Sequence, residues 1–497
     1  MKTILKSSFW QLTTVYAIAV ILISINLIWK YSYHFEVFAL ILAALSLFII
    51  KNQDIKISKL WIILPILFIL LIRIIPFVTN NIPLGYDPGI YKYAFESNRT
   101  DEWMLSTFPP GIYTFIDTLY SIGLTTDQIL IPFFIFMGLV LGLVIYITTK
   151  KFFNEDTAVL SMILYSVSII QFKVFTYFYF KNMLALIFLL LSFYLLKSNK
   201  RVLFILTAAF LGGIHRPTFL LFALIYVGYT ILHCKDWKKN VLSGTAIIIL
   251  TFPFYIGHFK ELILQSITPL ITANIGAGTF INLLTYQFST LIYLPFALIG
   301  FLHLIKNRRF NALFLWFVIN GIIVYFKIIF YDRFLIHMDI VMLILAGYGL
   351  YTIMQSKKKL GIAITVLLIA SALYISLNES IRTRPLIGNE ELGIIKALNN
   401  TEENSYVMAT SSYYSPWVLG YSGRRTIAPG LFDYNKWNYG QWVEFWTGSN
   451  STEELLSVYG KPLYIFVGRI QKMDIFNNSC FNLTKNINGT RIYGYMC

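Results

Sequence analysis

An acidic residue stands just beyond an apolar run near the start of the chain. Residues 60–79 are apolar, and the loop 80–127 that follows contains Asp87 within the sequence Gly-Tyr-Asp-Pro-Gly. A carboxylate at a lipid interface is partly desolvated, which suits a general base that takes a proton from a hydroxyl group. Asp-Pro-Gly is also ordinary turn chemistry, in which the aspartate caps the next helix. Asp87 is therefore a candidate catalytic base, with a capping role as the alternative.

Charged residues inside apolar runs are a second source of candidate chemistry, because intramembrane charges are expensive and often functional. Arg73 and Lys327 fall in the halves of their runs that we expect to face outward, so snorkelling of the side chain to the interface explains both. His215 and Arg216 instead interrupt the apolar stretch 202–232. A broken helix exposes backbone that must face protein or a water-filled cavity. The His215-Arg216 turn is therefore the stronger candidate.

The composition shows that a membrane must hold these residues. Of 497 residues, 57% are hydrophobic and 13% charged, and the mean hydropathy is +0.66. A soluble protein has about a quarter charged residues. This excludes a soluble multidomain enzyme and a disordered chain, and predicts a polytopic α-helical membrane protein with about 13 transmembrane or re-entrant helices. The apolar runs fall roughly at 9–29, 35–50, 60–79, 128–149, 157–172, 182–196, 202–214, 217–232, 241–257, 286–304, 312–329, 335–354 and 361–377.

The positive charges predict the orientation of these runs. The net charge is +16, and with the N-terminus inside the inner segments hold 19 lysines and arginines against seven in the outer loops. This bias follows the positive-inside rule, so we expect a multi-pass protein of the cell membrane with a cytoplasmic N-terminus and do not expect nucleic-acid binding. An odd number of crossings places the segment after residue 377 outside.

The outer tail changes composition and predicts a separate domain. We expect a transmembrane domain over 1–377 and a small extracytoplasmic α/β domain over 378–497, in which Ser405–Thr410 and Pro462–Gly468 are short buried strands and Glu390–Leu398 is a helix. Cys480 and Cys497 both lie in this tail, so a disulfide between them is an open expectation. The seven Asn-x-Ser/Thr triplets also fall on the expected outer face, at Asn98, Asn378, Asn399, Asn450, Asn477, Asn482 and Asn488.

The elements around Asp87 resemble a known superfamily. An acidic residue after an early membrane helix is followed by Pro109-Pro110-Gly111-Ile112-Tyr113, which begins an amphipathic segment over 108–123 that we expect to lie on the outer leaflet. Together with many later spans, this order resembles the GT-C superfamily of membrane glycosyltransferases, such as the protein O-mannosyltransferases and the aminoarabinose transferase of lipid A. The segments 211–218 and 331–350 also resemble the corresponding family segments. The resemblance covers roughly residues 60–430 through loose motifs in a shared order.

The resemblance implies an activity and roles for individual residues. Such enzymes transfer a sugar, with inversion, from a polyprenyl (dolichyl) phosphate to a protein, lipid or glycan acceptor outside. Asp87 would then deprotonate the attacking hydroxyl group. Phosphate-binding cations are also needed. Arg333 is the first candidate, with a structural ion pair to the neighbouring Asp332 as the alternative. Lys181 and Lys173 follow, and for them snorkelling is the alternative. Arg216 and Tyr91 complete the expected substrate contacts.

The sequence departs from the family in two places. The second outer loop, 173–181, contains no carboxylate, so we expect no metal or other cofactor, although Glu96, Asp101 and Glu102 on the first loop leave a divalent ion open. Lys436 to Trp442 resembles an oligosaccharyltransferase motif but lacks its first tryptophan and its aspartate, so we interpret it as an aromatic surface patch. The segment 419–425 is expected to be a solvated turn, unless it reaches the active site.

Two other classes of function stay open on the sequence alone. A transporter or flippase is disfavoured because no repeated halves and no matching pairs of broken helices occur. A non-catalytic membrane protein of surface assembly is the other alternative. The Asp87→Asn substitution separates them, because only a transferase should lose turnover. The sequence does not identify the sugar, the length of the lipid carrier or the acceptor.

Overall fold

The computed structural model describes residues 59–97, 107–256, 281–328, 331–430, 434–448, 452–470, 476 and 479–497. The expected runs at 9–29 and 35–50 lie outside these residues. The chain divides into two compact units, which are described separately here. The helical unit comprises Met1–Pro76, Ile135–Phe175 and Tyr179–Arg382, and the sheet unit comprises Phe77–Phe134, Thr176–Phe178 and Thr383–Cys497.

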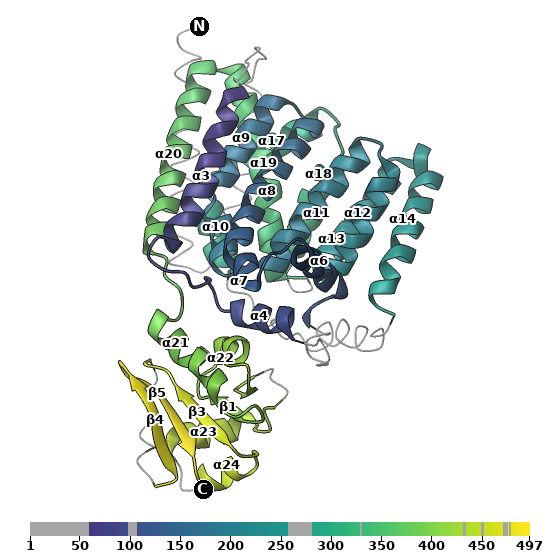
Figure 1. Cartoon of the computed structure of the whole chain (residues 1–497). Coiled ribbons are helices and arrows are strands. Elements are labelled where there is room, and N and C mark those ends of the chain that lie inside the picture. The colour runs from purple at the N-terminus through teal and green to yellow at the C-terminus, as the bar shows by residue number, and fades with distance from the viewer. Residues whose placement is uncertain are drawn as a thin grey trace. The chain divides into compact units, whose positions relative to one another are not determined.

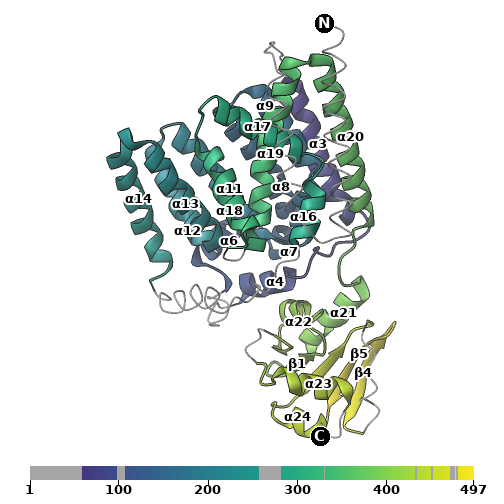
Figure 2. The same cartoon turned by 180° about the vertical axis from the view of Figure 1, so that it is seen from behind.

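The helical unit consists of apolar helices packed side by side (Figures 1 and 2). Four helices in the described part of the chain are long and apolar enough to cross a membrane, and up to seven spans result if each bent pair counts as one. The helices are α3 (Ile63–Ile74), α8 (Phe134–Phe152), α9 (Glu155–Ser166), α10 (Ile169–Thr176), α11 (Phe180–Lys197), α12 (Arg201–Ile214), α13 (Arg216–Leu232), α14 (Trp237–Thr251), α16 (Leu283–Thr290), α17 (Leu294–Lys306), α18 (Ala312–Tyr325), α19 (Tyr331–Ser356) and α20 (Lys358–Arg382).

Helix α19 is the centre of this unit, with α9 and α17 against it (Figure 1). Glycines make the close crossings. A Cβ on Gly349 would lie 2.0 Å from the carbonyl oxygen of Phe296 in α17, and a Cβ on Gly300 would lie 2.1 Å from that of Leu345 in α19. Small residues at membrane helix contacts let backbones approach and gain van der Waals packing. Gly349 of the late helix and Gly300 of α17 therefore fix the contact between these two helices.

Three helices of this unit end in the same turn. Asn199, Arg308 and Lys327 follow α11, α17 and α18 and have positive φ angles of 55°, 53° and 54°. After α17, the amides of Arg308 and Arg309 donate to the carbonyls of Ile305 and Leu304 at 2.9 Å each. This is the Schellman pattern, which satisfies the last carbonyls of a helix and usually places glycine at the left-handed position.

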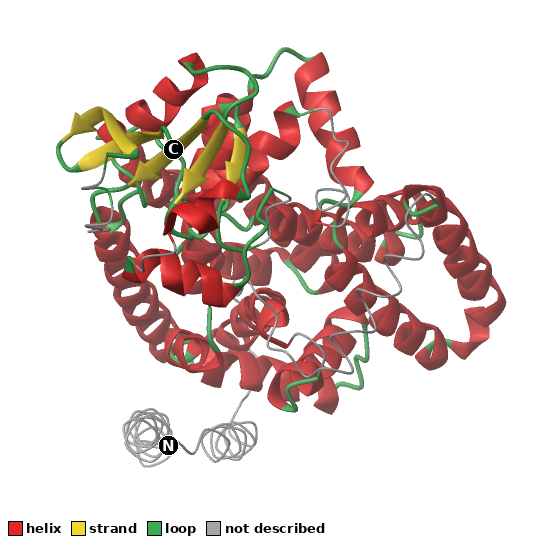
Figure 3. Cartoon of the chain, turned by 90° about the horizontal axis from the view of Figure 1, so that it is seen from below, coloured by secondary structure: helices red, strands yellow, loops and turns green. Residues whose placement is uncertain are grey.

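The sheet unit contains a sheet whose strands are drawn as yellow arrows in Figure 3. It has five strands in the order β2-β1-β3-β5-β4. β1 is parallel to β2 and β3, whereas β5 is antiparallel to β3 and β4. Asn488-Gly489 joins β4 to β5, and both residues have positive φ, as a tight hairpin turn requires. The strands are β1 (Tyr406–Ala409), β2 (Arg425–Ile427), β3 (Leu463–Val467), β4 (Phe481–Ile487) and β5 (Thr490–Tyr495).

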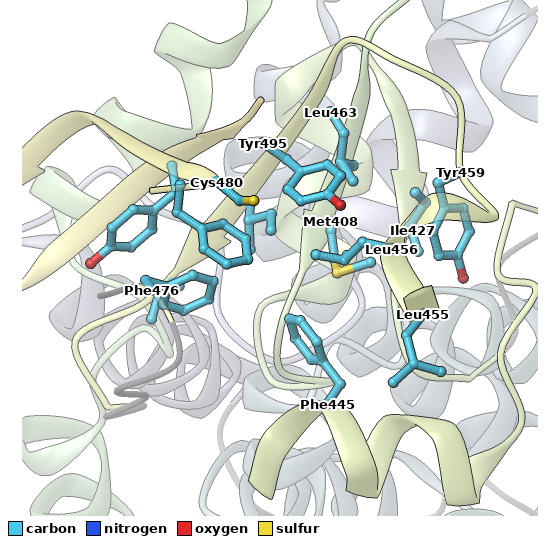
Figure 4. Close-up of a cluster of buried hydrophobic side chains, with 14 of the residues drawn as sticks. Met408, Ile427, Phe445, Leu455, Leu456, Tyr459, Leu463, Phe476, Cys480 and Tyr495 are labelled. Carbon is cyan, nitrogen blue, oxygen red and sulfur yellow. The ribbon is translucent and has the colours of Figure 1, made fainter. Parts of the chain in front are cut away.

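Helices cover both faces of this sheet. Met408 and Ile465 point to one face, where Phe445 and Leu456 pack against them (Figure 4). Their strand neighbours, such as Val407 and Phe466, point to the other face and pack against helices α21 and α22. Both faces are buried, so the expected strands at 405–410 and 462–468 are confirmed, as is the helix at 390–398. The unit's helices are α4 (Pro88–Glu96), α6 (Pro110–Ser121), α7 (Thr126–Gln128), α21 (Asn389–Ala397), α22 (Ser415–Ser422), α23 (Tyr439–Thr447) and α24 (Thr452–Ser457).

Two details of the tail test the expectations directly. Cys480 and Cys497 form a disulfide, as anticipated. The expected aromatic surface patch at 436–442 is wrong for its tryptophans, because Trp437 and Trp442 are 4% and 2% exposed in the core beneath α23. The indole N–H of Trp437 donates to the carbonyl oxygen of Leu455, and that of Trp442 donates to the side-chain oxygen of Asn435. Because both N–H groups have partners inside the protein, neither tryptophan needs contact with water.

Candidate functional site

Asp87 occupies the N-cap position of α4 in the sheet unit. Its side chain makes no capping hydrogen bond to the helix, so the capping alternative describes its position but not its role. The preceding residue, Tyr86, donates its hydroxyl to the carbonyl oxygen of Ser412 at 2.7 Å. Burial, and to a smaller extent the Asp87 carboxylate, raises the pKa of Tyr86 to about 12. The phenol therefore stays protonated and holds this end of α4 to the segment before α22.

Helix α22 packs directly on α4. A Cβ on Gly89 would lie 1.9 Å from the carbonyl oxygen of Pro416, and a Cβ on Gly420 would lie 2.2 Å from that of Gly89. One turn later, the ammonium group of Lys92 lies 5.2 Å from the centre of the Tyr421 ring. The expected solvated turn at 419–425 is therefore wrong over 419–422, which is helical, and this segment does reach the helix that begins after Asp87.

Tyr91 lies on the inner side of α4. Its ring is 3% exposed and makes edge contacts with Phe108 and Phe178 at centroid distances of 5.0 and 5.2 Å. These contacts fix α4 inside the sheet unit. The expected role of Tyr91 in substrate binding stays a prediction.

Three of the predicted cations lie in the first turns of helices of the helical unit: Lys181 in α11, Arg216 in α13 and Arg333 in α19. The charge of each acts electrostatically on the buried His215. Arg216 also lies 5.8 Å from the centre of the Tyr255 ring. Lys173 lies in the last turn of α10.

A chain of hydrogen bonds joins two of these helix ends. The hydroxyl oxygen of Thr218 lies 2.7 Å from Nδ1 of His215 and 2.7 Å from Nε2 of His337, whose Nδ1 lies 3.2 Å from the carbonyl oxygen of Arg333. A carbonyl can only accept, so Nδ1 of His337 donates, and a neutral His337 then accepts the Thr218 hydroxyl at Nε2. Thr218 in turn accepts from His215. The chain ties the His215-Arg216 turn to the start of α19.

A buried carboxyl group forms a second polar centre on α19. Asp339 is 0% exposed and accepts hydrogen bonds from Ser168 (3.0 Å), Gln171 (2.8 Å) and the Tyr293 hydroxyl. Ser168 lies at the break between α9 and α10, and Tyr293 at the break between α16 and α17. Asp339 on α19 is therefore hydrogen-bonded to residues at the breaks of both of these bent helix pairs. Sequence reasoning missed both His337 and Asp339, although ionisable residues within the apolar run 335–354 are the expected signal of such a centre.

Arg73 also lies elsewhere than expected. Its side chain is 1% exposed, so it does not snorkel to a lipid interface. The guanidinium carbon lies 5.4 Å from the Tyr165 ring centre and 5.7 Å from that of Phe175, and Gly138 leaves space for it. Arg73 therefore joins α3 to α8, α9 and α10 from inside the helical unit.

The described residues contain no group of three or more His, Cys, Asp or Glu side chains placed to hold a metal ion. Asp101 and Glu102 lie outside the described residues, whereas Glu96 is paired with Lys92 at 2.6 Å.

Comparison with solved structures finds similar folds at low sequence identity. The archaeal oligosaccharyltransferase AglB from Archaeoglobus fulgidus, in complex with an inhibitory peptide and a dolichol-phosphate, gives a TM-score of 0.58 at 13% identity and covers 82% of this chain and 68% of its own. ArnT from Cupriavidus metallidurans, bound to undecaprenyl phosphate, gives 0.58 at 13% identity over 88% of this chain and 97% of its own. The arabinofuranosyltransferase AftD from Mycobacteria gives 0.56 at 10% identity over 90% and 40%. No family model and no curated protein matches the sequence. The chain thus shares its fold with these three membrane proteins, as the sequence resemblance predicted, and carries a small C-terminal sheet domain.

Proposed function

We propose that this protein is an integral-membrane glycosyltransferase that moves a sugar from a polyprenyl phosphate to an acceptor on the outer face of the cell membrane. The observation that supports this most is that the charges of Lys181, Arg216 and Arg333 all act on the buried His215, in a chain whose fold is similar to those of AglB and ArnT. Those two structures hold dolichol-phosphate and undecaprenyl phosphate, two phosphates of the same chemical class.

The three cations would bind the phosphate of the donor. As the bond between sugar and phosphate breaks, negative charge returns to the phosphate, and fixed cations stabilise that charge more than they stabilise the bound donor. Guanidinium groups suit this role because they donate two parallel hydrogen bonds to phosphate oxygens. The bonded chain from His215 to the carbonyl of Arg333 supports the proposal, since it holds the ends of α13 and α19 in place. Lys173 would contribute less, and Tyr91 remains a proposed substrate contact.

Asp87 would act as the general base. Its carboxylate takes the proton of an acceptor hydroxyl, the oxygen attacks the anomeric carbon, and the carbon–oxygen bond to the phosphate breaks with inversion. The lipid phosphate leaves with the electron pair. The support for this role is the position of Asp87 in the sequence, directly after an early apolar helix, which resembles the position of the acidic residue in the GT-C enzymes.

The proposal includes the topology. We propose that the N-terminus is cytoplasmic, that 1–377 forms the transmembrane domain and that 378–497 is extracytoplasmic. The contacts of α22 with α4 give the outer domain a function, which is to hold the helix that begins after Asp87.

The test uses purified protein and a panel of polyprenyl-phosphate sugars. Asp87→Asn should reduce turnover at least about 100-fold while donor binding persists, because a positioned general base contributes that much. Arg333→Gln should weaken donor binding. Two matched controls should change neither: Asp117→Asn removes an exposed carboxylate of the same loop, and Lys327→Gln removes an exposed cation after α18. Wild-type turnover by Asp87→Asn would refute the base assignment, and absence of donor binding by the wild type would favour a transporter or a surface-assembly protein.

A further inference from the structure

A cavity of about 630 Å³ lies in the helical unit, away from Lys181, Arg216 and Arg333. It is lined by the start of α9, the end of α17 and the turn after it, and the last turns of α19. Along α19, Arg333 and Thr352 are separated by about 28 Å at 1.5 Å per residue. The cavity is therefore a separate place from the proposed donor site, and its volume is within the usual range for small-ligand pockets.

The lining of this cavity is positively charged. Lys306 and Arg309 contribute the charges, and Asn154, Asn307 and Gln355 contribute amide groups. No carboxylate lines the cavity, and within the described part of the chain neither cation forms an ion pair. Nearby Lys150, by contrast, is paired with Glu155 at 3.2 Å. Two unneutralised cations in a concave site concentrate positive potential there.

The cavity also has an aromatic wall. The rings of Phe153 and Tyr348 stack at a centroid distance of 4.4 Å, and the His303 ring meets Tyr348 edge-on at 5.4 Å. These contacts between three helix ends keep the wall in place. Lys306 and Arg309 are exposed to solvent, as snorkelling cations are, but both also line this one cavity together with the aromatic wall.

We propose that this cavity binds a ligand with a phosphate group, held by Lys306 and Arg309 and by the amide side chains. In the topology proposed above, this end of the helices faces the cytoplasm, so the phosphate comes either from an anionic lipid headgroup of the inner leaflet or from a soluble phosphate compound. Arg309 donates paired N–H groups to phosphate oxygens, and Lys306 supplies a point charge. The proposal concerns a second site and does not depend on the glycosyltransferase reaction.

The experiment measures binding to the purified full-length protein in detergent with two probes. Inorganic pyrophosphate represents the soluble source and is followed by calorimetry. Phosphatidylglycerol represents the lipid source and is followed by native mass spectrometry, with phosphatidylcholine as the neutral comparison. We expect saturable binding of one molecule of one probe, and at least about tenfold weaker binding by the Lys306→Gln/Arg309→Gln double variant, which lacks two charge-assisted contacts.

A matched double variant, Lys358→Gln/Lys359→Gln, removes the same charge from the exposed start of α20 and should bind as the wild type does. The charge-conserving Lys306→Arg/Arg309→Lys variant should retain binding, which assigns the loss in the first variant to the missing charges, and unchanged thermal unfolding of the glutamine variant excludes a folding defect. Equal weakening in the two glutamine variants would show general charge attraction and overturn the proposal. Failure of both probes to bind the wild type would overturn it as well.

Discussion

The contact between α4 and α22 predicts a large effect of a single methyl group. In Gly89→Ala, the new Cβ would lie 1.9 Å from the carbonyl oxygen of Pro416, whereas ordinary contacts of a Cβ begin at 3.4 Å. Backbone lies on both sides of this contact, so no side chain can rotate away and the helices must separate by about 1.5 Å. Overpacking of this kind costs about 1–3 kcal/mol. A displacement of about 1 Å at a catalytic group lowers the rate about 100-fold, and Gly89 lies two residues after Asp87.

The assay compares sugar transfer and thermal unfolding for Gly89→Ala, Gly420→Ala and Gly393→Ala. Gly420→Ala should reproduce the defect from the other helix, because its Cβ would lie 2.2 Å from the Gly89 carbonyl. Gly393 lies in α21 with nothing within 4 Å of a built Cβ, so its alanine variant should gain about 0.5–1 kcal/mol of stability and keep full activity. Wild-type activity and stability in both Gly89→Ala and Gly420→Ala would refute the packing of α22 on α4 as the device that holds Asp87.

Three further predictions concern stability, measured by unfolding in detergent. Asp339→Leu should lower the free energy of unfolding by about 2–4 kcal/mol, because three buried donors lose their acceptor. Asp339→Asn keeps an acceptor oxygen and should lower it by about 1 kcal/mol. Equal losses in the two variants would contradict the hydrogen-bonded centre. Arg308→Gly should gain about 0.5–1 kcal/mol by removing a side chain from a left-handed position, and a loss would show that the arginine makes a compensating contact. Cys497→Ser should destabilise the sheet unit by about 3 kcal/mol, since its disulfide with Cys480 closes a loop of 17 residues; unchanged unfolding under reducing and oxidising conditions would refute the pairing.

The sequence predicted several elements of local structure whose signal was itself local. The strand at 405–410 and the helix at 390–398 were found because apolar runs and helical periodicity act over a few residues. The hairpin at Asn488-Gly489 was missed although its two residues are a strong turn signal. Trp437 and Trp442 were wrongly expected at the surface, because a partial match to an oligosaccharyltransferase motif carries no information about burial.

The candidate site shows a similar division. Three cations at separate helix ends were predicted from their types and from the resemblance, and in the structure the charges of Lys181, Arg216 and Arg333 all act on the buried His215. The role of Asp87 remains a prediction. His337 and Asp339 were overlooked inside an apolar run. The sequence alone does not identify the hydrogen-bond partners that offset the cost of burying a polar group in a membrane.

The sequence by itself determined that this is a multi-span membrane protein with a GT-C-like order of elements, because composition and charge are read along the chain. Only the tertiary structure decided which segments support the site. Tyr86 and its partner Ser412 are 326 positions apart, and the glycines that let α4 and α22 touch are as widely separated. Such contacts depend on the shapes of two surfaces that meet only after folding. The sequence of each surface contains no local pattern that identifies its partner.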